Sequence, residues 1–192
     1  KKALDALLIG VYAVLDGQGI AGDSWETSAV NWATAGVAAD DDYKGTDAND
    51  QPQMTEVEQY KSQPTNRYFF NKWRAVYEGI ARANDVIKLA EDPDIILTAD
   101  EKNNILGQAR MLRGHFHFDA KRMWKNVPYI SETTTTYDNS TDIWPDIEAD
   151  FKFAYDNLPE TQSEGARVNK WAAACYLAKS FMFEHKYTEA KA

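Results

Sequence analysis

Apolar and polar residues alternate along this chain mainly with the periodicity of an α-helix. Apolar side chains that recur every three or four residues lie on one face of a helix, whereas strict alternation would indicate a strand. No convincing strand hairpin is found, so the pattern predicts an all-α fold. The predicted helices cover residues 3–15, 25–37, 66–91, 98–124, 142–158 and 169–185.

Polar residues at the starts of three predicted helices support these boundaries. Thr98 followed by Glu101 is a capping-box pattern, in which each side chain accepts a hydrogen bond from the other residue's backbone N–H. Asn169 is expected to cap the last long helix, and either Thr141 or Asp142 the helix before it. Each start therefore has an acceptor for the unpaired N–H groups of the first turn.

The longest segment without a helical pattern is residues 38–53, with the sequence AADDDYKGTDANDQPQ. It is polar and rich in turn-forming residues, and it has almost no apolar side chain to bury. Long loops within compact domains are commonly functional or disordered. We therefore expect ligand contacts here first.

Composition and charge narrow the classes of function. The chain has 192 residues, enough for one domain with a core or for part of a larger one, and its formal net charge is −9. Because nucleic-acid binding needs a basic face, this balance argues against a nucleic-acid partner. No apolar run approaches the roughly 18 residues of a membrane span. The single cysteine, Cys175, excludes an internal disulfide, and its apolar surroundings predict a buried thiol.

Residues 108–130 have a sequence specific enough to indicate a family. The segment reads QARMLRGHFHFDAKRMWKNVPYI and predicts a helix that breaks into a short extended piece. It resembles the signature helix of the SusD/RagB family, E-A-R-x-L-R-A-x-x-Y-F-D-L-x-R-x-x-G-D-V-P-L-I. The agreeing positions are Ala109, Arg110, Leu112, Arg113, Phe118, Asp119, Arg122, Val127, Pro128 and Ile130. The departures are Gln108, Gly114, Lys125 and Asn126, where the family has Glu, Ala, Gly and Asp.

Further segments resemble the same family in the correct order. They are the D-D-D-Y-K-G loop of residues 40–45, the Trp-to-Ile helix of residues 73–87, and R-V-N-K-W-A-A of residues 167–173. The last helices also resemble a tetratricopeptide unit, whose small residues let paired helices approach. Its matching positions are Ala174, Leu177, Ala178, Phe181, Tyr187 and Ala190. The resemblance implies a SusD-like helical array with tetratricopeptide-like helix pairs and long polar loops.

The resemblance also implies a place in the cell and a role. Family members are usually much longer, so we expect residues 1–192 to form a single N-terminal helical domain of a longer chain. The family consists of lipoproteins anchored in the outer membrane, on its extracellular face. They capture oligosaccharides or other nutrients and pass them to a TonB-dependent, SusC-like transporter. No catalysis and no cofactor are implied.

Two arginines on the signature helix, Arg110 and Arg113, have a spacing that makes them neighbours on its surface. They could bind an anion or a sugar. We favour a structural interpretation, because the fork-shaped guanidinium suits buried pairing with carboxylates such as Asp119 or Glu78. Asn84 is interpreted in the same way, as an amide that satisfies backbone groups between helices.

Metal binding is the weaker interpretation of two other groups. His115 and His117 are two residues apart on a helix, so their side chains point in different directions and cannot both bind one ion. The acidic residues 40–42 could bind calcium, but they lack the spaced ligands and closing Glu of an EF-hand. We therefore predict packed or surface histidines, a solvated acidic loop and no metal site.

Sugar binding needs an exposed aromatic face for stacking, together with amides and carboxylates for the hydroxyl groups. We expect the ring of Tyr43 to be exposed, because no apolar residue flanks it in the loop. In the family, the corresponding loop often contributes to the ligand face. Trp25 and Trp32 precede the loop, and each could equally contact the ligand or pack in the core. The candidate ligand-binding residues are Tyr43, Asp42, Asn49, Gln51 and Trp32.

Other classes of function are weighed beside glycan capture. The alternative is a helical-repeat scaffold that binds only protein and has no ligand site of its own. A hydrolase is not favoured, since the chain contains no G-x-S-x-G elbow, no P-loop and no H-E-x-x-H. We therefore predict a binding protein rather than an enzyme.

Overall fold

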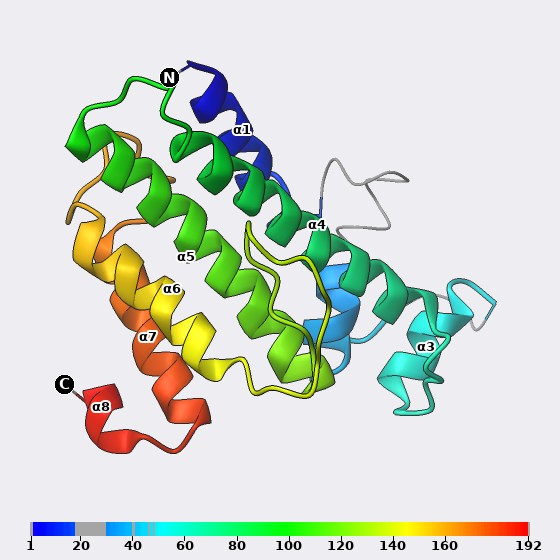
Figure 1. The fold of residues 1–192 in the computed structure, drawn as a ribbon. Helices are drawn as coiled ribbons and strands as arrows, with labels where there is room; N and C mark the ends of the chain where they lie inside the picture. The colour runs from blue at the N-terminus through cyan, green and yellow to red at the C-terminus, as the bar shows by residue number, and fades with distance from the viewer. Residues whose placement is uncertain (1, 18–29, 40, 46, 48, 192) are drawn as a thin grey trace. The chain divides into compact units, whose positions relative to one another are not determined.

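The computed structural model describes residues 2–17, 30–39, 41–45, 47 and 49–191. All regular structure in these ranges is helical, which confirms the all-α prediction. None of the described helices combines the length and apolar character needed to cross a membrane. The elements are α1 (Lys2–Tyr12), the π-helix η1 (Ala33–Val37), α3 (Pro52–Glu58), α4 (Arg67–Ala90), α5 (Ala99–Trp124), α6 (Trp144–Asn157), α7 (Lys170–Phe183) and α8 (Tyr187–Lys191) (Figure 1).

The predicted capping residues are confirmed at two of the three helix starts. Thr98 and Glu101 form the expected capping box, and Asn169 accepts a hydrogen bond from the backbone N–H of Ala172 (3.0 Å). The prediction of a Thr141 or Asp142 cap is wrong, because the N-cap of α6 is Ile143 and has no side-chain cap. Oδ1 of Asp142 pairs with Lys121 at 2.7 Å and accepts only a long hydrogen bond, 3.4 Å, from the backbone N–H of Trp144.

Two segments differ from the predicted boundaries. Helix α3 was not expected, so the polar loop ends at Gln51 rather than at residue 53. Of the predicted helix over residues 25–37, the described part is helical and widens into the π-helix η1, while Trp25 lies outside the described residues.

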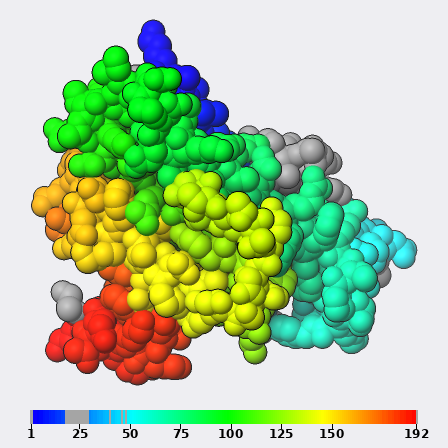
Figure 2. All heavy atoms as spheres, in the orientation of Figure 1, coloured from blue at the N-terminus to red at the C-terminus, as the bar shows by residue number. Residues whose placement is uncertain are grey.

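The chain folds as two compact units, and α4 contributes to both. The first unit comprises Lys1–Tyr12 and Gly79–Ala192. Within it, α5 packs against α1, α6 and α7, and α7 packs against α6 and α8. Side chains on nearly every side of α5 are buried for this reason. The segment that follows α5, yellow-green in Figure 2, lies at the surface beside α6.

Close packing of α5 and α6 depends on Gly114. A β-carbon at this position would lie 2.8 Å from Cε1 of Phe151 and 3.2 Å from Cβ of Asp150. Such distances are shorter than van der Waals contact, so α6 could not approach α5 as closely beside an alanine. The ring of Phe151 thus explains why this chain has glycine at position 114, where the family has alanine.

The second unit, Ala13–Glu78, is smaller and is built around η1, α3 and the first turns of α4. Helix α3 packs against η1. Apolar residues from all three elements meet in its core, to which α4 contributes Tyr68. The core consists of Val30, Ala33, Val37, Met54 and Tyr68.

The prediction of a buried Cys175 is wrong, because its side chain is exposed on α7. Trp171 and Met182 of the same helix are also exposed. Helix α7 is apolar on most of its circumference, with the sequence KWAAACYLAKSFMF. The periodicity of such a helix does not indicate which face is buried.

Candidate ligand-binding surface

The polar loop begins by folding back onto η1. The backbone N–H groups of Asp41 and Asp42 donate hydrogen bonds to the carbonyl oxygen of Gly36, at 3.2 and 3.1 Å. The carboxylate of Asp42 occupies the space that a side chain at Gly36 would need. The loop can therefore approach the helix only because position 36 is a glycine.

This turn brings together two of the predicted residues, Trp32 and Asp42. The indole Nε1 of Trp32 donates a hydrogen bond to Oδ2 of Asp42 at 2.9 Å. The Trp32 side chain is 37% exposed, so it lies at the surface rather than in the core. The hydrogen bond fixes the orientation of a ring that still presents area to solvent.

Tyr43 is exposed at the surface, while the next residue, Lys44, is buried. Lys44 is only 8% exposed, and its Nζ donates hydrogen bonds to the backbone carbonyl oxygens of Asp47 (2.9 Å) and Asp50. The Tyr43 ring is 70% exposed, as expected from the sequence.

The other two predicted residues support the loop. The side-chain oxygen of Gln51 accepts hydrogen bonds from Nη2 of Arg67 and from the hydroxyl of Tyr68, both at 2.9 Å. Gln51 has φ of 47° and immediately precedes α3, so these bonds hold a left-handed corner in place. Asn49 donates its backbone N–H to Oδ1 of Asp47 at 2.9 Å, and its side chain is exposed.

A further aromatic residue, Tyr60, was missed by the sequence reasoning. It follows α3 in a left-handed conformation (φ 55°), and its ring is 74% exposed. Its hydroxyl donates to the carbonyl oxygen of Ala38 at 2.9 Å, which attaches it to the end of η1. The sequence could have predicted its exposure, because polar residues flank Tyr60 as they flank Tyr43. We call Trp32, Asp42, Tyr43 and Tyr60 the η1 surface.

The described part of the acidic loop does not assemble a metal site. Oδ2 of Asp42 is engaged by Trp32, and Asp40 lies outside the described residues. Among the residues that the structure describes, no three His, Cys, Asp or Glu side chains form a group that could hold a metal ion.

The two arginines of α5 belong to a buried network centred on Asp150 of α6. Nε and Nη2 of Arg113 donate to Oδ2 and Oδ1 of Asp150, at 2.8 and 2.7 Å. Nε of Arg110 and the hydroxyl of Tyr129 also donate to this carboxylate, at 2.8 and 2.7 Å. Burial alone would raise the pKa of Asp150, but the hydrogen bonds and charges of the arginines outweigh it and lower that pKa.

The structural interpretation of the arginines is thus supported, with a different partner. Asp119 pairs with Arg122 instead, at 2.9 Å. Asn84 has the expected role, since its amide donates to the carbonyl oxygen of Ile130 (3.0 Å) while its oxygen accepts from Arg113 (2.9 Å). These residues bind one another, and their contacts join α5, α6 and the segment after α5.

His117 is buried in the same region and ties the extended segment to α5. Its Nε2 accepts a hydrogen bond from the backbone N–H of Ile130 at 3.0 Å, so its Nδ1 carries the proton and donates to the carbonyl oxygen of Arg113 at 3.1 Å. Burial lowers the pKa of His117 from 6.5 to about 3. His115 packs edge-on against the ring of Tyr176, with centroids 5.3 Å apart. Both histidines therefore have packing roles.

Comparison with known proteins assigns the chain to a family. A family model described as starch-binding and associating with the outer membrane, SusD-like, matches residues 1–182. SusD-like protein P2 of Formosa agariphila is 26% identical over 128 residues, which cover 62% of this chain and 25% of that protein.

Solved structures agree with this assignment at the level of the fold. A laminarin-binding SusD-like protein has a TM-score of 0.80 at 23% identity, covering 99% of this chain and 41% of that one. Surface glycan-binding protein A of Bacteroides fluxus has a TM-score of 0.80 at 20% identity, covering 97% and 40%. The chain thus spans well under half the length of the relatives it matches. By its sequence match and its fold, the chain belongs to the SusD-like family.

Proposed function

We propose that the protein captures oligosaccharides at the cell surface and passes them to a TonB-dependent, SusC-like transporter. The observation that carries the proposal is the η1 surface, where three aromatic side chains are exposed around one short π-helix and its loop. Laminarihexaose is bound by surface glycan-binding protein A of Bacteroides thetaiotaomicron, whose structure aligns with 97% of this chain at a TM-score of 0.75 and 18% identity.

The chemistry of the η1 surface suits an oligosaccharide. Sugar rings present C–H faces that pack on aromatic rings, and Trp32, Tyr43 and Tyr60 supply such rings. The remaining lone pairs of Asp42 can accept hydrogen bonds from sugar hydroxyl groups. Because Asp42 also orients Trp32, one carboxylate contributes to both kinds of contact.

The proposal includes the setting of the longer protein. We infer that residues 1–192 are the N-terminal helical domain of a lipid-anchored protein on the extracellular face of the outer membrane. Its role is capture and transfer of the ligand, without hydrolysis. Support comes from the outer-membrane association of the family and from relatives that are more than twice as long as this chain.

Isothermal titration calorimetry with laminarihexaose tests the glycan-binding part. Tyr43→Ala should weaken binding by about tenfold or more, since stacking on one aromatic ring contributes roughly 0.5–1.5 kcal/mol beyond the apolar area it buries. Tyr137→Ala is the matched control, because Tyr137 is 80% exposed and belongs to the other unit. Equal affinities of the two variants would contradict a role for the η1 surface.

The scaffold alternative predicts a different pattern. The exposed Trp171 and Met182 on α7 favour it, since they form an apolar face suited to protein contact. A scaffold would pull down an outer-membrane barrel protein, show no heat with any oligosaccharide, and be unaffected by Tyr43→Ala. Capture predicts that Tyr43→Ala lowers ligand uptake while the protein complex stays intact.

A further inference from the structure

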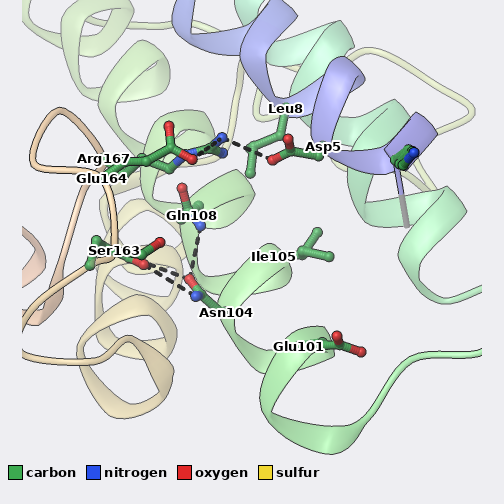
Figure 3. Close-up of a pocket in the computed structure, with 11 residues that line it drawn as sticks. Asp5, Leu8, Glu101, Asn104, Ile105, Gln108, Ser163, Glu164 and Arg167 are labelled. Carbon is green, nitrogen blue, oxygen red and sulfur yellow. Dashed lines mark hydrogen bonds and ion pairs between the residues drawn. The ribbon is translucent and has the colours of Figure 1, made fainter.

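A cavity of about 470 Å³ opens in the first unit, between α1, the start of α5 and the segment that precedes α7 (Figure 3). No residue of the η1 surface lines it. Its volume is within the range of small-molecule sites, roughly 300–1,000 Å³. Neither the packing of the helices nor the proposed capture site accounts for it.

One wall of the cavity is a set of three interlocked amides. Asn104 and Gln162 form a reciprocal pair, with Nε2 of Gln162 donating to Oδ1 of Asn104 (2.9 Å) and Nδ2 of Asn104 donating back (3.2 Å). Nε2 of Gln108 donates to the same Oδ1 at 2.8 Å, while the hydroxyl of Tyr12 donates to Oε1 of Gln108 at 2.8 Å. The amides are therefore fixed before any ligand arrives, which reduces the entropy lost on binding.

Hydrogen-bond donors remain on this wall. An amide group has two N–H bonds, and Asn104 and Gln108 each use one of them within the described part of the chain. Gln108 is only 4% exposed, so its second N–H has little access to bulk water except through the cavity that it lines. A buried donor without a partner costs free energy, which a ligand oxygen would recover.

Acceptors also lie in the lining of the cavity. Nη2 of Arg167 donates to Oδ1 of Asp5 at 2.9 Å and to Oε1 of Glu164 at 3.3 Å (Figure 3). Each carboxylate has further lone pairs that can accept from a ligand. The cavity thus offers both donors and acceptors, and Ile105 adds an apolar contact.

The charge of the lining disfavours anionic ligands. The acidic side chains Asp5, Glu101 and Glu164 exceed the basic Lys2 and Arg167 by one. An anion would meet this excess of negative charge, and the two bases are not gathered into a fork for it. A hydroxyl group both donates and accepts, so it matches a lining of mixed donors and acceptors.

We propose that this cavity is a second binding site, which takes a neutral hydroxylated ligand of monosaccharide or disaccharide size. It acts independently of the η1 surface and does not rest on the function proposed for that surface. None of the described residues that line the cavity is aromatic, so stacking is not expected to contribute there. We therefore expect a dissociation constant in the millimolar range, which corresponds to about 4 kcal/mol of binding free energy.

NMR titration of the ¹⁵N-labelled protein with cellobiose tests the proposal. The side-chain amide signals of Asn104 and Gln108 should shift and saturate. Asn104→Ala should raise the dissociation constant at least fivefold, and Asn103→Ala should leave it unchanged, since Asn103 is an exposed neighbour on α5 outside the cavity. Ser163→Tyr, at an exposed position of the rim, should block the cavity without removing an amide, and it serves as the second variant should Asn104→Ala unfold.

The outcomes separate the two sites. Saturation that survives Tyr43→Ala and is lost in Asn104→Ala or Ser163→Tyr supports the cavity. The proposal is overturned by the absence of saturable shifts, by cellobiose binding that both cavity variants retain, or by binding that only Tyr43→Ala abolishes. The last result would leave the η1 surface as the sugar site. Tighter binding of glucuronate than of cellobiose would overturn the neutral ligand class.

Discussion

Arg113 and Asp150 form a two-pronged ion pair in which both side chains are buried and every acceptor position of the carboxylate is filled. Two of the four donors come from Arg113, one from Arg110 and one from Tyr129. A carboxylate has about four lone-pair positions, so no water is needed to complete the network. Removing Asp150 leaves Arg113 with Glu132 as its remaining carboxylate partner and leaves the buried network with excess positive charge.

Asp150→Asn should destabilise the protein by about 3–5 kcal/mol, the range for breaking one partner of a buried ion pair. The amide would turn N–H donors toward the guanidinium groups, which are themselves donors. Urea unfolding followed by circular dichroism measures the loss. Asp156→Asn is the control on the same helix, where an exposed pair with Lys152 predicts a change within about 0.5 kcal/mol. Similar losses in the two variants would contradict the central position of Asp150.

Gly114→Ala should destabilise the protein by about 1–3 kcal/mol, because the new methyl group overlaps the ring of Phe151. The family's usual residue would thus be unfavourable in this chain. Gly10→Ala on α1 is the matched control, since nothing lies within 4 Å of the added carbon. There the gain in helix propensity should stabilise by up to about 1 kcal/mol. Thermal unfolding shows whether each substitution stabilises or destabilises the protein. Stabilisation by both would disprove the overlap between the new methyl group and Phe151.

The buried imidazole of His117 should make stability depend on pH. Its pKa is about 3 in the folded protein, against an ordinary value of 6.5, so between these values only the unfolded chain binds the proton. This contribution to stability is fully present above pH 6.5 and is lost as the pH falls toward 3, by about 1.4 kcal/mol per pH unit. Glu184 acts in the opposite direction, because burial and its neighbour Glu148 raise its pKa to about 7.

Comparing the pH dependence of unfolding free energy between wild type and His117→Gln separates the contribution of His117 from that of Glu184, which is present in both proteins. We expect the free energy of unfolding of wild type to decrease more steeply from pH 6.5 to 4.5 than that of the variant. His185→Gln removes an exposed imidazole and controls for the loss of a histidine as such. Parallel pH profiles for wild type and His117→Gln would show that the buried ring is not kept neutral.

The hydrogen bond between Trp32 and Asp42 should matter for glycan affinity. Asp42→Ala removes the acceptor that orients the indole, so laminarihexaose affinity should fall about three- to tenfold, or roughly 0.7–1.4 kcal/mol. Asp42→Asn retains an oxygen acceptor and should recover most of the affinity. If Asn were as weak as Ala, the negative charge of Asp42, rather than its bond to Trp32, would be the property that matters.

Much of the helical architecture follows from the sequence, because long amphipathic segments and side-chain caps are local signals. The long helices α4 and α5 end within a few residues of their predicted limits. Helix α3 was not predicted because it has only seven residues and buries only Met54 and Val57, too few apolar positions to define a period.

Tertiary partners could not be predicted in the same way. Arg113 and Asp150 are 37 residues apart and lie on different helices, so no local spacing links them. For the candidate site, the exposure of Tyr43 was predictable from its polar neighbours. The inward turn of Gln51 and the participation of Tyr60 depend on left-handed backbone conformations, which residues other than glycine rarely adopt.

Lys44 secures the loop through main-chain oxygens, those of Asp47 and Asp50. Every amino acid supplies such an oxygen, so the side chains between these points can change while the same lysine keeps the backbone in place. A loop built in this way is free to change its side chains, and with them its binding properties, in the course of evolution without first losing its shape.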